Sequence, residues 1–302
     1  MNGKISNGMQ VAYTRRYTLT EGKENGLKVI EVDNGCLRFI LNESKALDIM
    51  QLWHEGKNIS FVSKNGFTAR ELPFLRRFEG GMLYSCGLDS VGGREGFELH
   101  GNLHNTPAKV VECTCGEKEI VVRAEIEDTS LFGKNLLLLR TIKTEIGSDT
   151  LCVEDELINR GTKEEEYCLL YHINLGYPML DEGVEIYSET EEVIPRTDWS
   201  AERIADRTVF TDCVDNEDER CYFIRNKVPC VQVTNRKLGK RFTLNYSADT
   251  LPCFVQWSSA ASGDYALGVE PTTTFLDDRF EYKKLAVGNS VRFSIKMQIE
   301  KI

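Results

Sequence analysis

The sequence predicts an all-β protein, and three observations lead to this prediction. Apolar and polar residues alternate strictly over several segments, most clearly from Val291 to Glu300. Such alternation places every apolar side chain on one face of a strand. Strand-like segments also follow one another at short intervals, separated by turns that contain glycine. Amphipathic helical patterns are scarce, and the best of them is the short segment 197–207. Together these features are typical of a large antiparallel sandwich or barrel.

Four strands are predicted with definite positions along the chain. Val122, Ala124 and Ile126 alternate with charged residues, and the turn at Gly147 and Ser148 separates the next two apolar segments. We therefore expect the sheets to include the following strands: 120–127, 136–146, 151–158 and 290–299. Proline and glycine cluster nowhere enough to mark a linker, so residues 1–302 are predicted to form one domain.

The composition restricts the class of partner. The chain has 302 residues, 41% hydrophobic and 28% charged, and a formal net charge of −10. Nucleic-acid-binding surfaces are normally basic, so no nucleic-acid partner is expected. The acidic runs 164–166 and 215–219 are predicted to be solvated loops. A small substrate with little or no charge fits this composition better than a polyanion.

The cysteines and the N-terminus indicate a cytoplasmic protein. Cys113 and Cys115 form C-x-C and not the C-x-x-C of zinc ribbons. Cysteines inside apolar runs behave as small hydrophobic residues; these are Cys86, Cys152, Cys168 and Cys253. The segment from Met1 to Arg16 lacks the apolar core of a signal peptide, and no stretch approaches the ~20 apolar residues of a membrane span. We expect reduced thiols without disulfides and no membrane partner.

The segment 74–107 departs from the strand pattern. It is rich in glycine, keeps several apolar residues and shows little periodicity. Glycine permits positive φ and close backbone approach, and long ordered loops are often functional. We expect this segment to pack over a cleft and to bring Arg76 or Arg77 near His100. His54, which follows Trp53, is predicted to lie at the surface or at a rim.

A carboxylate and two histidines are candidates for proton transfer. Glu270 follows an apolar run and precedes Pro271, which is predicted to end the strand, so its carboxylate would be desolvated and its pKa raised. His172 ends another apolar run beside Asn174, and His100 lies upstream. Each residue alone also fits a structural role, the glutamate as a strand end facing solvent.

Metal and cofactor sites have little support in the sequence. His100 and His104 have the i, i+4 spacing of helical metal ligands, but Gly101 and Pro107 disfavour a helix there. No glycine-rich loop leads from a strand into a helix, so no nucleotide cofactor is predicted. We expect neither a metal nor a cofactor.

The motifs taken in order resemble the galactose mutarotase-like superfamily, and most closely its poorly characterised bacterial branch of aldose 1-epimerase-related proteins. The resemblance covers about residues 34–299 and rests on five segments of the chain: 80–88, 99–101 and 105–108, then 154–161 with 171–174, and 267–271. It implies a supersandwich of large twisted antiparallel sheets with a cleft on one face.

The resemblance also implies an activity and roles for residues. Glu270 would be the general base and His172 the general acid of an aldose mutarotase, an isomerase that exchanges sugar anomers through ring opening. His100, Arg77 or Arg76, Asn174 and His104 would contribute to binding the sugar. Arg77 is slightly favoured over Arg76, and His104 competes with His100 as the first histidine of the family. A monomer or homodimer acting in carbohydrate metabolism is expected.

Two alternatives stay open at this point. One is a non-catalytic carbohydrate-binding or regulatory protein on the same scaffold. The other is an enzyme with different sugar chemistry, such as proton abstraction of the lyase type. Retention of both histidines and Glu270 favours an enzyme, because binding alone needs no matched acid and base.

Overall fold

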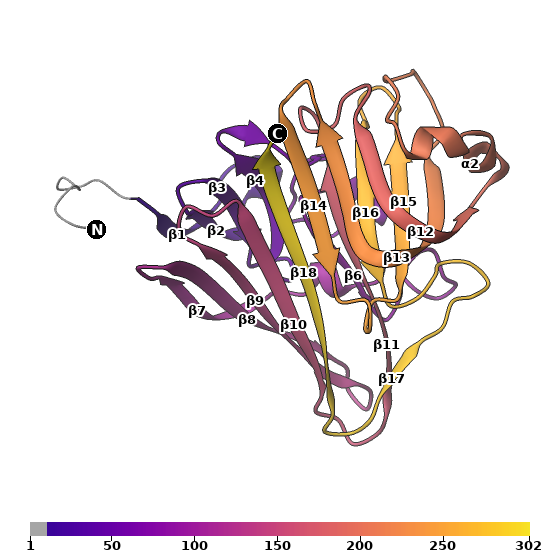
Figure 1. Cartoon of the computed structure of the whole chain (residues 1–302). Coiled ribbons are helices and arrows are strands. Elements are labelled where there is room, and N and C mark those ends of the chain that lie inside the picture. Colours follow the sequence, from indigo (N-terminus) through magenta and orange to yellow (C-terminus); the bar gives the residue numbers. More distant parts are fainter. Residues whose placement is uncertain (1–10) are drawn as a thin grey trace.

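The computed structural model describes residues 11–302, and it consists of two antiparallel sheets with very little helix (Figure 1). The smaller sheet has five strands in the order β1-β2-β3-β4-β5. Its strands are β1 (Tyr13–Thr18), β2 (Lys28–Asp33), β3 (Leu37–Asn42), β4 (Asp48–His54) and β5 (Lys57–Asn58).

The larger sheet has thirteen strands, in the order β17-β11-β16-β15-β13-β14-β18-β10-β9-β8-β7, with β12 paired to β13 and β6 to β11. Its strands are β6 (Tyr84–Leu88), β7 (Lys109–Cys115), β8 (Glu119–Thr129), β9 (Asn135–Glu145), β10 (Thr150–Asn159), β11 (Glu165–Leu175), β12 (Glu185–Pro195), β13 (Arg220–Asn235), β14 (Lys240–Tyr246), β15 (Cys253–Ser259), β16 (Ala266–Thr272), β17 (Lys283–Leu285) and β18 (Ser290–Lys301). The helices are short: α1 (Phe74–Arg77), α2 (Asp198–Glu202) and the 3₁₀ turns η1 (Gly22–Glu24), η2 (Leu103–Asn105) and η3 (Ile204–Arg207).

The all-β prediction is confirmed, and the predicted strands lie where the alternation placed them. The four predicted ranges correspond to β8, β9, β10 and β18. In β18, Phe293, Ile295, Met297 and Ile299 are buried while their neighbours face outward. The predicted helical segment is also present, as α2 followed by η3. Alternation worked here because one face of these strands packs on the core and the other meets solvent.

The smaller sheet packs on the larger one, and the two share an apolar core. Side chains from β2 and β3, such as Val32 and Phe39, belong to the same buried cluster as Ile142 of β9 and Ile295 of β18. A second buried cluster covers the opposite side of β11, β13 and β15. Strand β11 is therefore buried on both faces, which explains its continuous apolar sequence.

The segment 74–107 contains more regular structure than its sequence indicates. It includes α1 and η2, and its central part forms β6, which pairs with β11. All five residues of β6 are buried, so no alternation marks it as a strand. At Gly87 the two strands approach so closely that a Cβ would lie 2.3 Å from the carbonyl oxygen of Cys168, and φ is +128°. Only glycine fits that position.

The sequence also predicted the surroundings of His54 and the state of the thiols. The prediction that His54 lies at the surface or at a rim is wrong: His54 is buried, and its Nδ1 atom lies 2.8 Å from the Lys240 Nζ atom. The ten cysteines are all free. No helix within residues 11–302 has the length and apolar character needed to cross a membrane. The prediction about a signal peptide concerns a segment that falls mainly on residues 1–10, which lie outside the described part.

Candidate active site

The strand register brings His172 and Glu270 together. They lie on the neighbouring antiparallel strands β11 and β16, in which Ile173 pairs with Val269. The same register places His172 directly opposite Glu270, so both side chains leave the sheet on one face. The His172 Nε2 atom lies 3.3 Å from the Glu270 Oε1 atom. Both residues are almost fully buried, with 5% and 2% of their surfaces exposed.

The sequence context predicted that Glu270 lies at a strand end. The structure places it inside a strand. Strand β16 continues through Pro271, which pairs with Phe254 of β15, to Thr272. The ladder between β11 and β16 is interrupted opposite Pro271, where a residue without an N–H group is tolerated. Glu270 is thus held in the middle of a sheet, which fixes its position more firmly than a strand end.

Gly268 leaves the space that the pair occupies. A Cβ atom on this residue would lie 2.2 Å from the Glu270 Oε1 atom and 3.2 Å from the His172 Cε1 atom. Gly268 is therefore a requirement of the site and not of a turn.

The pair opens into a cavity of about 480 Å³, which is within the size range of small-molecule sites. His100 lines the same cavity, and its ring centroid lies 5.7 Å from that of His172. The segment 74–107 contributes further lining residues, among them Phe74 and Phe78 beside the two histidines. The structure therefore places His100, His172 and Glu270 around one cavity, under the segment predicted to cover a cleft.

His100 is positioned as a hydrogen-bond donor. The backbone N–H of Gly92 donates to its Nδ1 atom at 3.3 Å, so the ring proton of the neutral form is on Nε2. Burial lowers the pKa of His100 to about 4. His100 therefore stays neutral at physiological pH and can offer one N–H group.

Burial also sets the charge of the catalytic candidates. It raises the pKa of Glu270 well above the usual range, with a further contribution from the Glu219 carboxylate, which the Arg196 guanidinium partly offsets. The pKa of His172 is lowered well below its usual value, again by burial and then by His100. Both shifts favour the uncharged forms, a protonated carboxyl group on Glu270 and a neutral imidazole on His172.

Three residues on the cavity wall were not identified from the sequence. Arg196 follows β12 and pairs with Glu219, which precedes β13, and the Trp257 Nε1 atom of β15 donates to Glu219 at 2.6 Å. The predicted loop at 215–219 is present, with Asp218 and Glu219 exposed, but its residues 217–219 also line the cavity. Trp257 lies on the same face of β15 as Val255 and Ser259, which also line the cavity.

The remaining predicted residues lie outside the cavity lining. Asn174 is buried, and its Nδ2 atom donates to the carbonyl oxygens of His172 and Gly81, so it supports the backbone of β11. Arg76 is exposed. Arg77 is buried and lies 3.3 Å from Glu98, two residues before His100. Arg77 thus ties the two parts of segment 74–107 together.

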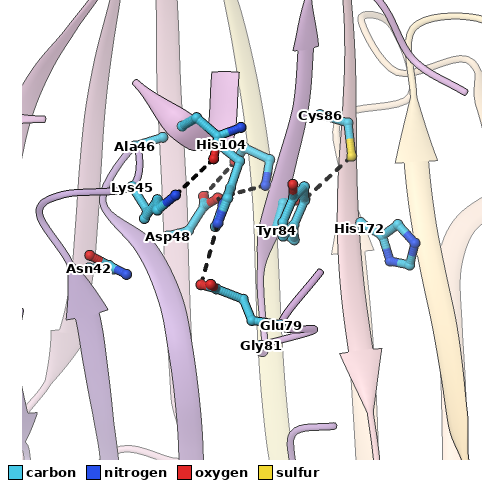
Figure 2. A network of polar contacts seen from close by, with 12 residues as sticks. Asn42, Lys45, Ala46, Asp48, Glu79, Gly81, Tyr84, Cys86, His104 and His172 are labelled. Carbon is cyan, nitrogen blue, oxygen red and sulfur yellow. Dashed lines mark hydrogen bonds and ion pairs between the residues drawn. The ribbon is translucent and has the colours of Figure 1, made fainter. Parts of the chain in front are cut away.

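His104 belongs to a buried polar network on the other side of β6 (Figure 2). Its Nδ1 atom lies 2.7 Å from Asp48, its Nε2 atom lies 3.4 Å from Glu79, and its ring stacks on Tyr84. Burial favours the neutral ring, but the two carboxylates outweigh it, and the pKa of His104 is raised. These buried contacts are typical of a histidine that stabilises the fold.

Asp48 also joins that network to the core between the sheets. It accepts a hydrogen bond from Arg140 at 2.6 Å, and Arg140 pairs with Asp155, which accepts from the Tyr171 hydroxyl. Within residues 11–302, no group of three or more His, Cys, Asp or Glu side chains is arranged to hold a metal ion.

Several solved structures share this fold. A candidate aldose 1-epimerase from Klebsiella pneumoniae superposes with a TM-score of 0.84 at 20% identity, covering 97% of this chain and 88% of that one. A galactose mutarotase-like protein from Clostridium acetobutylicum gives 0.71 at 11% identity, with coverages of 96% and 99%. A candidate mutarotase from Salmonella typhimurium gives 0.70 at 15% identity, with coverages of 95% and 93%.

These similarities show a galactose mutarotase-like fold. No curated protein matches the chain in sequence. Residues 24–299 match the family described as a domain of unknown function, DUF4432. The chain therefore belongs to the DUF4432 family, within the galactose mutarotase-like fold.

Proposed function

We propose that this protein is an isomerase of the aldose 1-epimerase type, which exchanges the anomers of a sugar by acid–base ring opening. The observation that supports this most directly is the 3.3 Å contact between His172 and Glu270 at the wall of a cavity. A carboxyl group and an imidazole, which can act as base and acid, line this cavity together with the hydrogen-bond donor His100. A sugar hemiacetal needs such an arrangement, because one oxygen must lose a proton while another gains one.

Entry of a sugar prepares the pair for the reaction. The hydroxyl groups of the sugar make the cavity more polar, and this stabilises charged forms that burial disfavours. The proton of the Glu270 carboxyl group then moves across the 3.3 Å contact to the His172 Nε2 atom. A carboxylate base and an imidazolium acid result, with no change in the net charge of the pair.

Ring opening and closure follow from these two charges. The Glu270 carboxylate takes the proton from the anomeric hydroxyl, and His172 gives its proton to the ring oxygen as the bond between that oxygen and the anomeric carbon breaks. The His100 Nε2–H group donates a hydrogen bond to a sugar oxygen and holds the ring in place. Rotation about the bond between the first two carbons, followed by the reverse proton transfers, yields the other anomer.

Substitution of the two proton carriers tests the proposal. Glu270→Gln keeps the shape but cannot accept the proton, so anomer exchange should fall by about 10²–10⁴-fold, the usual range for a positioned acid or base. His172→Asn should cause a comparable loss. Exchange is measured by NMR on a freshly dissolved anomer of a sugar that the wild type converts. Sugar affinity should change less than turnover, since the lost interaction acts mainly in the transition state.

His104→Asn is the comparison variant, assayed at a temperature where it stays folded, because His104 lies in the network around Asp48 and outside the cavity lining. It should reduce exchange less than His100→Asn. Near wild-type exchange by Glu270→Gln would remove the base assignment, and a carbohydrate-binding or regulatory role would then lead. The ten free thiols support a cytoplasmic location as part of this proposal.

A further inference from the structure

Carboxylates outnumber cationic side chains on the cavity wall. Four line it besides Glu270: Glu217, Asp218, Glu219 and Asp264. Among residues 11–302, two cationic side chains, Lys64 and Arg196, line the same space. The wall therefore has an excess of negative charge around the place where a sugar would lie.

Both cations are already engaged by carboxylates of the same wall. Lys64 Nζ lies 2.6 Å from Asp264 Oδ2, across a sequence separation of 200 residues. Arg196 pairs with Glu219, whose second oxygen accepts the hydrogen bond from Trp257. Neither cation is free to take a phosphate or carboxylate group without giving up its partner.

The remaining carboxylates differ in their surroundings. Glu217 is neutralised from behind by the buried Arg220, whose Nη2 atom lies 2.6 Å away. The Asp218 carboxylate is exposed and has no ion pair or hydrogen bond within the described part of the chain. Its charge is therefore uncompensated at the wall.

We propose that Asp218, Glu219 and Asp264 make this cavity selective against anionic sugars, so that uncharged sugars are admitted and sugar phosphates are rejected. This inference rests on the proposed function for its reaction but concerns a separate property, the charge of the ligand. An anionic ligand would meet an unpaired carboxylate and two cations that are already neutralised. Phosphate groups are normally held by free Arg or Lys side chains or by helix N-termini.

The first measurement compares glucose, galactose and mannose with their 6-phosphates on the wild-type protein at low ionic strength. The kcat/KM of anomer exchange should be at least about tenfold lower for the phosphates, since a cleft of one charge sign changes the local ligand concentration by that order or more. The difference should shrink at high salt, where exposed charges are screened. Equal or faster exchange of the phosphates would overturn the inference and assign Lys64 and Arg196 as phosphate ligands.

The second measurement uses the Lys64–Asp264 pair. Asp264→Asn removes one carboxylate and frees Lys64, so the ratio of kcat/KM for glucose 6-phosphate to that for glucose should rise several-fold, to about tenfold. Asp249→Asn is the matched control, because it removes the same charge from an exposed position outside the cavity. An unchanged ratio in Asp264→Asn, or an equal rise in Asp249→Asn, would contradict the inference.

Measurements of sugar binding test the charge selectivity independently of the proposed reaction. NMR titration with the same six sugars reports charge selectivity even when no exchange occurs. Weaker binding of the phosphates without exchange of any sugar would remove the proposed reaction and keep the selectivity. Binding of the phosphates alone would overturn the selectivity.

Discussion

Gly268→Ala tests whether the geometry of the His172–Glu270 pair matters for function. The new methyl group would lie 2.2 Å from the Glu270 Oε1 atom, whereas real Cβ contacts do not fall below 3.0 Å. The carboxylate must therefore move by at least about 0.8 Å, the difference between these two distances. The His172 ring, at 3.2 Å, must also yield slightly.

The expected loss of activity follows from this displacement. A shift of about 1 Å in a reacting group can cost about 10²-fold in rate. The fold should persist, because overpacking costs about 1–3 kcal/mol and replacing a strand glycine by alanine recovers about 0.5–1 kcal/mol. We therefore expect exchange to fall by about 10²-fold while the melting temperature changes by only a few degrees.

The assay is anomer exchange by NMR, with thermal unfolding measured on the same samples. Gly93→Ala is the control, because it adds a methyl group to the same cavity wall at an ordinary 3.7 Å from the Leu99 Cδ1 atom. It should lose much less activity than Gly268→Ala. Exchange by Gly268→Ala within threefold of the wild type would refute the reasoning, since the carboxylate would then not need its observed position.

Two predictions concern stability and pH. His104→Asn should destabilise the fold by about 3 kcal/mol or more, because it removes the partner of the buried Glu79 carboxylate and leaves Asp48 with Arg140 alone as its cationic partner. The pKa of His104 is raised in the fold, so its contribution to stability is complete below its ordinary value of 6.5 and is lost as pH rises through the folded pKa. The difference in melting temperature between this variant and the wild type should therefore narrow as pH rises above 6.5. Glu270→Gln should melt above the wild type at pH 7, because the raised pKa of the buried carboxyl group makes folding less favourable as pH rises above its ordinary value of 4.5. That gap should close toward pH 4, where the unfolded chain is protonated as well, and a gap that does not depend on pH would contradict the explanation for either variant.

The sequence determined the fold class because its strands are amphipathic. In β8 and β18 apolar residues alternate with polar ones, and this alternation shows which face of the strand is buried. The local sequence is therefore enough to predict these strands. Strand β6 shows no alternation, because both of its faces are buried, and its sequence therefore predicted a loop. A fully buried short strand and a glycine-rich loop look alike until the neighbouring strand is known.

The sequence also indicated which residues to consider for chemistry, but not how they would lie. His100, His172 and Glu270 were singled out by their contexts, and they do surround one cavity. The position of Glu270 was misjudged, since Pro271 was expected to end a strand that in fact continues. A missing N–H group ends a strand only where the ladder needs it, and the pairing with β11 is interrupted at that point.

Only the tertiary structure showed which other residues line the cavity and which residues His104 contacts. Arg196, Glu219 and Trp257 come from the ends or faces of different strands, and no local pattern links them. Glu219 lies in an acidic run that is indistinguishable in sequence from a solvated loop, and it faces a cavity because β13 pairs with β15. His104, four residues from His100, turns to Asp48 and Glu79 on the other side of β6. Strand pairing brings together residues far apart in sequence, and its partners are chosen by the whole sheet, so these contacts cannot be derived from neighbouring residues alone.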